Sequence, residues 1–195
     1  LEKAEVDPLP KQAAPANAPP MEEVHTPNVG SIEAVCGFLK VKPQELIKTL
    51  IYKADAEVFA ALVRGDHEVN QEKVNQIFVG QHIDLADEET IVKATGAAVG
   101  FAGPVGLVGR VGKILIDHAV AAMAVGVAGA NKTDYHITNV VPGRDFPMDG
   151  QTIQVCDIRN AVQGDTYEGK TLLFKRGIEV GQVFKLGTKY SVKLE

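Results

Sequence analysis

Three ionisable side chains interrupt apolar stretches of this sequence, and such side chains are the first candidates for chemistry. Lys48 lies in a strand-like segment, where a lysine either extends its ammonium to solvent or binds an anion. Asp117 closes the apolar run Ile114–Ile116, and His136 lies in the strand-like segment Tyr135–Thr138. A carboxylate or imidazole can move protons in a reaction, although each alone is more often a hydrogen-bonded structural group. Both interpretations stay open for these residues.

The segment Gly100-Phe-Ala-Gly-Pro104 could bind a carbonyl or phosphate oxygen through its main chain, because glycine and proline favour a stiff turn with free N–H groups. A second glycine pattern, Gly164–Thr171, fits the GxxxxGK[ST] formula of phosphate-binding loops. Its context contradicts that function. Asp165 and Glu168 would repel phosphate, and the following Leu172–Lys175 resembles a strand instead of a helix. We predict an acidic surface turn there.

The composition limits the classes of function. The 195 residues are enough for one large domain, or one domain with appendages. With 20 Lys and Arg against 25 Asp and Glu, the formal charge of −5 gives no bulk attraction for a polyanion, so nucleic acid would need a local patch. Cys36 and Cys156 form no CxxC pair and the five histidines show no paired ligand spacing, so we expect no metal. Without an apolar run of about 18 residues, we expect no membrane span and a cytoplasmic location.

The elements that must position these groups alternate irregularly. Residues 1–20 are rich in proline and alanine, which predicts a linker. Beyond it, capping residues with apolar spacing predict helices, and β-branched or aromatic runs predict strands. The predicted helical segments are 32–39 after Ser31, a turn from Pro43, 71–78 after Asn70 and 88–94 after Asp87. The predicted strands are 49–52 and 58–63, joined as a hairpin, with 113–116, 135–140 and 172–175. This order predicts an α+β fold, with a compact, mixed, largely antiparallel sheet or partial barrel flanked by short helices.

Taken together, several segments resemble the insertion domain of bacterial-type prolyl-tRNA synthetase. The segments that carry the resemblance are Met21–Pro27, Lys48–Leu50, Leu62–His67, Val99–Val105, Asp117 with Ala121–Met123, Val127–Asn131 and Tyr135–His136. Asp157–Asn160 and Lys175–Ser191 resemble the place where that chain returns to its class II catalytic domain, although Gln182 replaces a histidine usual there. The resemblance implies an editing domain over residues 21–160 and a return segment over 161–195.

In that family the insertion hydrolyses alanine wrongly attached to proline tRNA, and it is related to free-standing aminoacyl-tRNA deacylases. Editing is needed because missing methylenes in an apolar site change binding by only about 1–3 kcal/mol. The resemblance implies that Lys48 holds the phosphate and terminal adenosine of the tRNA. It also implies that Gly100, Gly103 and Pro104 belong to a loop whose backbone N–H groups stabilise the ester oxyanion, while ordered water attacks.

The same resemblance implies an amino-acid pocket. Ile32 and Val35, one helical turn apart, align with its apolar lining, and His136 aligns with the histidine that shapes it. Asp117 falls near this pocket, with either a chemical role or a role in holding the loop. A small pocket of this kind would admit alanine and exclude proline.

Partners and cofactors follow from the resemblance as well. Editing requires no cofactor, whereas the parent ligase uses ATP and Mg, and the class II motifs that bind ATP are not recognisable in this sequence. The expected partners are the acceptor end of proline tRNA, the alanine moiety of mischarged tRNA and the catalytic domain of a homodimeric parent. Two alternatives remain: a non-catalytic module that positions tRNA, and a free-standing deacylase for alanine, serine or cysteine esters.

Overall fold

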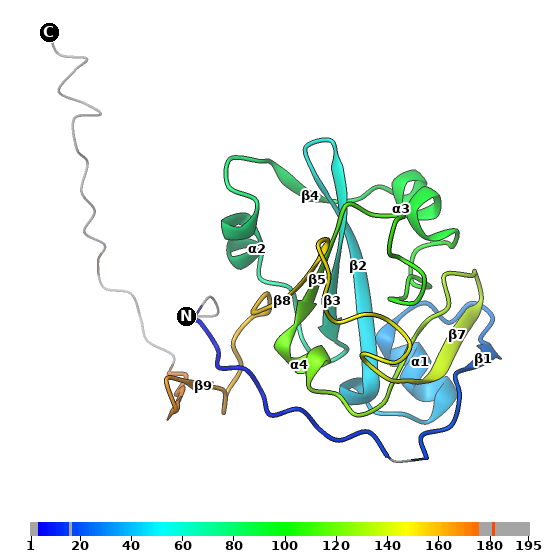
Figure 1. The fold of residues 1–195 in the computed structure, drawn as a ribbon, viewed down its shortest axis with the longest axis horizontal. Helices are drawn as coiled ribbons and strands as arrows, with labels where there is room; N and C mark the ends of the chain where they lie inside the picture. The colour runs from blue at the N-terminus through cyan, green and yellow to red at the C-terminus, as the bar shows by residue number, and fades with distance from the viewer. Residues whose placement is uncertain (1–3, 16, 176–180, 182–195) are drawn as a thin grey trace, which may run out of the picture.

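The two longest strands form the centre of the fold. The computed structural model describes residues 4–15, 17–175 and 181. In it β2 (Leu46–Ala54) and β3 (Glu57–Arg64) pair as an antiparallel hairpin, closed by a tight turn in which Asp55 has φ +49°. Most residues of β3 are fully buried, because elements cover both of its faces (Figure 1). The predicted hairpin is confirmed, with strands longer than the sequence indicated.

Further strands extend this hairpin on both sides into one mixed sheet. They are β1 (Glu22–His25), β4 (Ile83–Leu85), β5 (Lys113–Asp117), β6 (Gly126–Gly129), β7 (Tyr135–Val140) and β8 (Ile153–Cys156). Their order is β1-β7-β6-β2-β3-β5-β8, and β4 also pairs with β2. The pairs β2–β6, β3–β5 and β5–β8 are parallel, and the other pairs are antiparallel. The predicted α+β class with a mixed sheet is confirmed.

Short helices cover the sheet, and capping side chains fix where three of them begin. The helices are α1 (Ile32–Leu39), α2 (Gln71–Ile77), α3 (Glu88–Thr95) and α4 (His118–Ala121), with a 3-10 turn at Pro43–Glu45. Ser31, Asn70 and Asp87 accept the first backbone N–H groups of α1, α2 and α3, as their sequence positions predicted. Residues of α3 pack on the main core, those of α2 on a second core around Phe59, and those of α1 on a third around Leu46.

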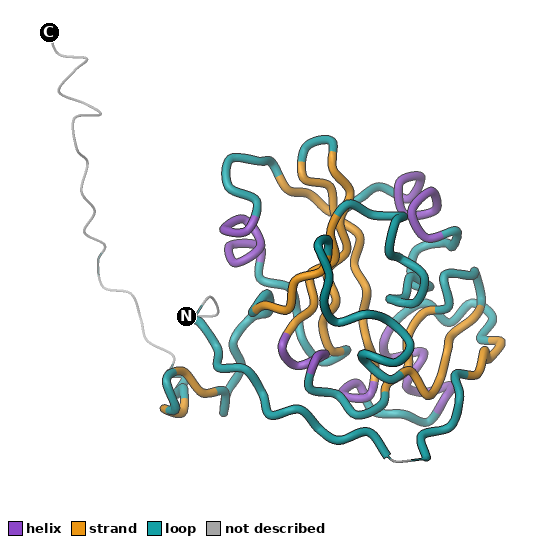
Figure 2. Tube along the Cα trace, viewed as in Figure 1, coloured by secondary structure: helices purple, strands orange, loops and turns teal. Residues whose placement is uncertain are grey.

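The N-terminal segment is held against the domain instead of hanging free. Residues 4–15 and 17–20 contain no helix or strand and run along one side of the sheet (Figure 2). The N–H of Val6 donates to Asp157 at 2.8 Å, and Asp7 bonds through its main chain to Thr166 at 2.8 Å. The Asp7 carboxylate accepts two further N–H groups, from Glu168 and Gly169, and these bonds lower its pKa. The segment that leads into the domain therefore lies beside the segment that leaves it.

The glycine pattern at 164–171 is a turn, as its acidic residues predicted. It forms a hairpin of β9 (Thr166–Tyr167) and β10 (Lys170–Thr171) with a two-residue turn, Glu168 and Gly169, at positive φ, and the next described residues, 172–175, are not helical. The prediction of a strand over 172–175 is wrong. Pairing stops at Thr171, and Leu173 is 71% exposed, so no apolar surface is available to bury a longer strand. Most of the predicted return segment, including Gln182, lies outside the described residues.

Candidate active site

A cavity of about 410 Å³ lies along the free edge of β2. The β6 ladder ends at Ile47 and the β4 ladder begins at Tyr52, so residues 48–51 have no strand partner on that side. Consecutive residues of β2 line the cavity, because it lies against the edge of the strand and not against one face. The remaining wall comes from the start of α1, from α3 with the residues before it, from the loop after α3, and from β6 and β7: Gly30, Ser31, Ile32, Val35, Leu85, Ala86, Ile91, Val99, Gly100, Ala102, Val127, Ala128, Gly129 and His136.

Five of the residues proposed from the sequence meet at this cavity. They are Ile32, Val35, Lys48, Gly100 and His136, which come from α1, β2, the 99–105 loop and β7. Gly103 and Pro104 follow the lining residue Ala102 in sequence, but neither they nor Asp117 are among the lining residues. The fold therefore brings together residues that are up to about a hundred positions apart in sequence.

Lys48 lines the cavity, and its ammonium forms an ion pair with an exposed carboxylate. Its Nζ lies 2.8 Å from Oε1 of Glu68, and the two side chains are 15% and 72% exposed. An ion pair with such an exposed carboxylate contributes little stability, since water competes for both partners. A phosphate can therefore replace Glu68 at low cost. Sequence analysis did not predict this pairing, which joins residues 20 positions apart.

The loop at Gly100 approaches its neighbours too closely for any side chain. Gly100 has φ +96°, and a Cβ there would lie 2.6 Å from the carbonyl oxygen of Gly30. A Cβ at Gly103 would overlap the carbonyl oxygen of Gly129 in β6. Through these close contacts the loop packs against Gly30, just before α1, and against Gly129 in β6.

Several backbone N–H groups of this loop, including those of Gly100 and Ala102, are available to a ligand. The N–H of Gly103 donates to Asn131 at 2.8 Å, and that of Phe101 donates to Ala98 at 3.2 Å. No acceptor within residues 4–15 and 17–175 takes the N–H of Gly100 or Ala102, and both residues line the cavity. Paired N–H groups of this kind stabilise an oxyanion when they point at a reacting carbonyl.

Asn131 holds the loop, and sequence reasoning did not single it out. Its amide nitrogen donates to the carbonyl oxygens of Gly103 at 3.0 Å and Val105 at 2.7 Å, and its amide oxygen accepts the Gly103 N–H. Asn131 itself has φ +52°, a conformation that asparagine tolerates better than most residues. One side chain thus fixes the C-terminal part of the loop on both sides of Pro104.

His136 is buried, and its ring is positioned from behind. Its Nδ1 lies 2.7 Å from the hydroxyl of Thr26, and its ring centroid lies 5.5 Å from that of Phe101. Burial lowers its pKa, so the imidazole is neutral at pH 7. Thr26 is a second residue that the sequence did not single out, since its contact spans 110 positions.

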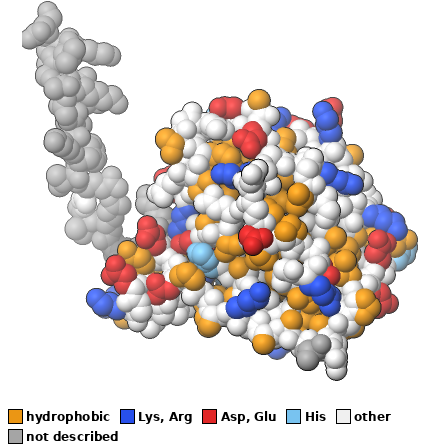
Figure 3. All heavy atoms as spheres, in the orientation of Figure 1, with side chains coloured by type: hydrophobic (Ala, Val, Ile, Leu, Met, Phe, Trp, Pro, Cys, Tyr) orange, Lys and Arg blue, Asp and Glu red, His pale blue; other side chains and the backbone are white. Residues whose placement is uncertain are grey.

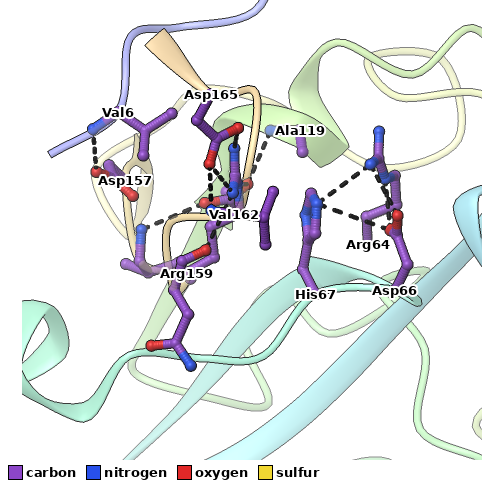
Figure 4. A network of polar contacts seen from close by, with 12 residues as sticks. Val6, Arg64, Asp66, His67, Ala119, Asp157, Arg159, Val162 and Asp165 are labelled. Carbon is purple, nitrogen blue, oxygen red and sulfur yellow. Dashed lines mark hydrogen bonds and ion pairs between the residues drawn. The ribbon is translucent and has the colours of Figure 1, made fainter. Parts of the chain in front are cut away.

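The Asp117 side chain has structural partners and does not line the cavity. Its carboxylate accepts the N–H of Ala119 at 2.8 Å, which caps α4, and the N–H of Ile158 at 3.3 Å. Arg159 lies 3.5 Å away and bonds Asp165 with two contacts of 2.7 Å (Figure 4). Burial raises the pKa of Asp117, opposed by these hydrogen bonds and by Arg159. The arrangement ties residues 157–165 to the sheet.

The described surface offers no single-sign patch on the face drawn in Figure 3, where acidic and basic side chains are interspersed around apolar ones. Among the described residues, no three His, Cys, Asp or Glu side chains are grouped so that they could hold a metal ion. In the same part of the chain, every helix is too short or too polar to cross a membrane.

Comparison with known proteins identifies relatives of this fold and site. A sequence model of the aminoacyl-tRNA editing domain matches residues 26–146, which include every cavity-lining residue. The chain is 50% identical over 176 residues to a proline–tRNA ligase of Thermoanaerobacter sp. (strain X514), an alignment that covers 88% of this chain and 30% of the ligase. It is 47% identical over 197 residues to that of Geobacter sulfurreducens, covering 100% of this chain and 33% of the ligase. The chain thus spans about a third of the length of these relatives.

Solved structures share the architecture at low sequence identity. A structure described as that of a candidate trans-editing enzyme for prolyl tRNA synthetase superposes with a TM-score of 0.59 at 18% identity. The superposition covers 72% of this chain and 87% of that one. At this level of identity the likeness concerns the fold.

Proposed function

The chain belongs to the aminoacyl-tRNA editing domain family, and from this premise we propose that its cavity hydrolyses the ester of alanine wrongly attached to proline tRNA. The observation that carries the proposal is that Gly100 and Ala102, whose N–H groups are free, line the same cavity as Lys48. The ester carbonyl lies against these N–H groups, and the Lys48 ammonium binds phosphate and adenosine at the tRNA end.

Water is the nucleophile in this mechanism. The hydroxyl of Ser31, which lines the cavity, already accepts the N–H of Ala34 as the cap of α1. Attack by water on the ester carbonyl forms a tetrahedral oxyanion, which the N–H groups of Gly100 and Ala102 stabilise. Collapse of this intermediate releases alanine and leaves the terminal ribose hydroxyl of the tRNA.

Selection against proline comes from the walls of the pocket. Ile32 and Val35 on α1 and the neutral ring of His136 on β7 bound the end that receives the amino-acid side chain. The Thr26 hydrogen bond fixes the ring of His136, so the pocket cannot widen by a simple ring rotation. A proline ring requires more volume than the methyl group of alanine and is excluded sterically.

The proposal places the domain, residues 21–160, as an insertion within a cytoplasmic proline–tRNA ligase. The similarity to about a third of each relative supports this, and so does the packing of Val6 and Asp7 beside Asp157 and Thr166. An insertion must leave its host chain and return to it at neighbouring points. The host would supply ATP- and Mg-dependent ligation, its own dimer contacts and a return segment from residue 161, whereas the editing site needs no cofactor.

A time course of deacylation tests the function. Alanyl and prolyl esters of proline tRNA are incubated with the wild-type chain and with Lys48→Ala, at matched protein concentration. Selective release of alanine by the wild type, with a large loss in the variant, is the expected result. If tRNA binds but neither ester is cleaved above the uncatalysed rate, the chain positions tRNA without hydrolysing it.

A further inference from the structure

One polar side chain in the cavity wall has no partner. Thr49 lies in the middle of β2 opposite Leu62 and lines the cavity, yet it is only 9% exposed. Its hydroxyl makes no hydrogen bond within the described residues. Its neighbours on the same strand face, Ile47 and Ile51, belong to the main apolar core. An unpaired hydroxyl in such surroundings destabilises the folded state, so it calls for a partner that the protein alone does not supply.

The main chain of Thr49 also faces the cavity edge. Successive residues of a strand direct their N–H and C=O groups to opposite edges, and residues two apart share an edge. The carbonyl oxygen of Ile51 accepts the N–H of Ala86 on the cavity side of β2. Thr49 therefore directs its N–H and C=O to this same side, where neither the β6 ladder nor the β4 ladder reaches it.

The cavity has no carboxylate to hold a cation. Within the described residues, none of those that line it is Asp or Glu, and Lys48 carries the permanent charge. His136 is neutral at pH 7 because burial lowers its pKa. A positively charged group that enters must therefore be held by the oxygen atoms of hydroxyl and carbonyl groups.

We propose that the hydroxyl and carbonyl oxygens of Thr49 accept hydrogen bonds from the α-ammonium of the aminoacyl ester, which makes Thr49 a specificity-determining residue. The inference rests on the proposed function, which brings an aminoacyl ester into this cavity. The free N–H groups of Gly100 and Ala102 are donors and cannot hold an ammonium. A rotation of about 120° about the Cα–Cβ bond moves the threonine hydroxyl between staggered positions, so it can turn to the ligand while β2 stays in place.

Two esters of proline tRNA separate this role from a structural one. Alanyl-tRNA carries the α-ammonium, and lactyl-tRNA carries a hydroxyl in its place with the same methyl group. We expect the wild-type chain to prefer the alanyl ester. Thr49→Val, which has the same shape without the hydroxyl, should lower kcat/KM for alanyl-tRNA by roughly 10- to 100-fold and change that for lactyl-tRNA by less than about twofold. Thr49→Ser should keep the preference.

A stability measurement accompanies the kinetics. Thr49→Val should unfold at the same temperature as the wild type or higher, because it removes an unpaired buried hydroxyl. Thr49→Ala is a second variant without the hydroxyl and should lose the preference for the alanyl ester as well. The proposal is overturned if either variant keeps the wild-type rate on alanyl-tRNA, or loses activity equally on both esters. If the wild type cleaves neither ester, the proposed function itself fails.

Discussion

Replacing Asn131 with alanine should release the loop that carries the two proposed oxyanion donors, Gly100 and Ala102. The Asn131 side chain makes three hydrogen bonds to this loop, with lengths of 2.7 to 3.0 Å, to the main chain of Gly103 and Val105. Nothing else in the described residues takes the N–H of Gly103. The substitution therefore leaves loop groups unpaired and removes the side-chain link between position 131 and the loop, while the main-chain bond from the N–H of residue 131 to Phe101 remains.

The expected loss of stability follows from these contacts. Three hydrogen bonds at about 1 kcal/mol each give about 3 kcal/mol, and alanine at φ +52° adds about 1 kcal/mol of backbone strain. Asn28→Ala is the matched control, since Asn28 has φ +60° and its side chain makes no hydrogen bond within the described residues. Asn28→Ala should lower the free energy of unfolding by only about 1 kcal/mol. The difference of about 3 kcal/mol between the unfolding free energies of the two variants measures the contribution of the three Asn131 side-chain hydrogen bonds.

Urea unfolding followed by far-UV circular dichroism measures this difference, because the chain has no tryptophan for a fluorescence signal. Deacylation of alanyl-tRNA at a temperature where both variants are folded should show a lower kcat for Asn131→Ala, since its oxyanion donors are no longer fixed. The reasoning is refuted if Asn131→Ala is no less stable than Asn28→Ala. It is refuted equally if the loop variant is destabilised and retains its full kcat.

Three further perturbations test other parts of the structure. Glu68→Gln should maintain or raise the rate of deacylation, because it removes the exposed carboxylate that competes with phosphate for Lys48. Lys48→Ala should lower kcat/KM by roughly 10- to 100-fold. Equal losses in the two variants would contradict the anion-binding role of Lys48. Gly103→Ala should destabilise the chain by about 1–3 kcal/mol in urea, since its Cβ meets the backbone of β6, while Gly37→Ala in the exposed part of α1 should be neutral or stabilising. Burial and the neighbouring arginines lower the pKa of His67 to about 4, so the unfolded state binds a proton that the folded state does not. The contribution of His67 to stability is thus complete above about pH 6.5 and should fall by about 3 kcal/mol as the pH drops to 4. His67→Gln should lose less stability over this pH range, and an unchanged loss would show that another group causes the acid sensitivity.

The helix starts and the central hairpin could be predicted from short-range sequence patterns. Ser31, Asn70 and Asp87 marked three helix starts, because a capping side chain acts on N–H groups two or three residues away. The β-branched and aromatic runs marked the central hairpin for a similarly local reason. The prediction failed at Leu172–Lys175, where a strand would need a partner that short-range pattern cannot supply.

The assembly of the site depends on contacts between distant parts of the chain. Lys48 and Thr49 belong to a cavity because the β6 and β4 ladders leave a gap along β2, and no local pattern encodes where two distant ladders stop. The contacts of Thr26 with His136 and of Asn131 with Gly103 span 110 and 28 positions. A hydrogen bond forms only when donor and acceptor lie about 3 Å apart in a suitable direction. For residues far apart in sequence, this distance depends on how the whole chain packs and cannot be read from neighbouring residues.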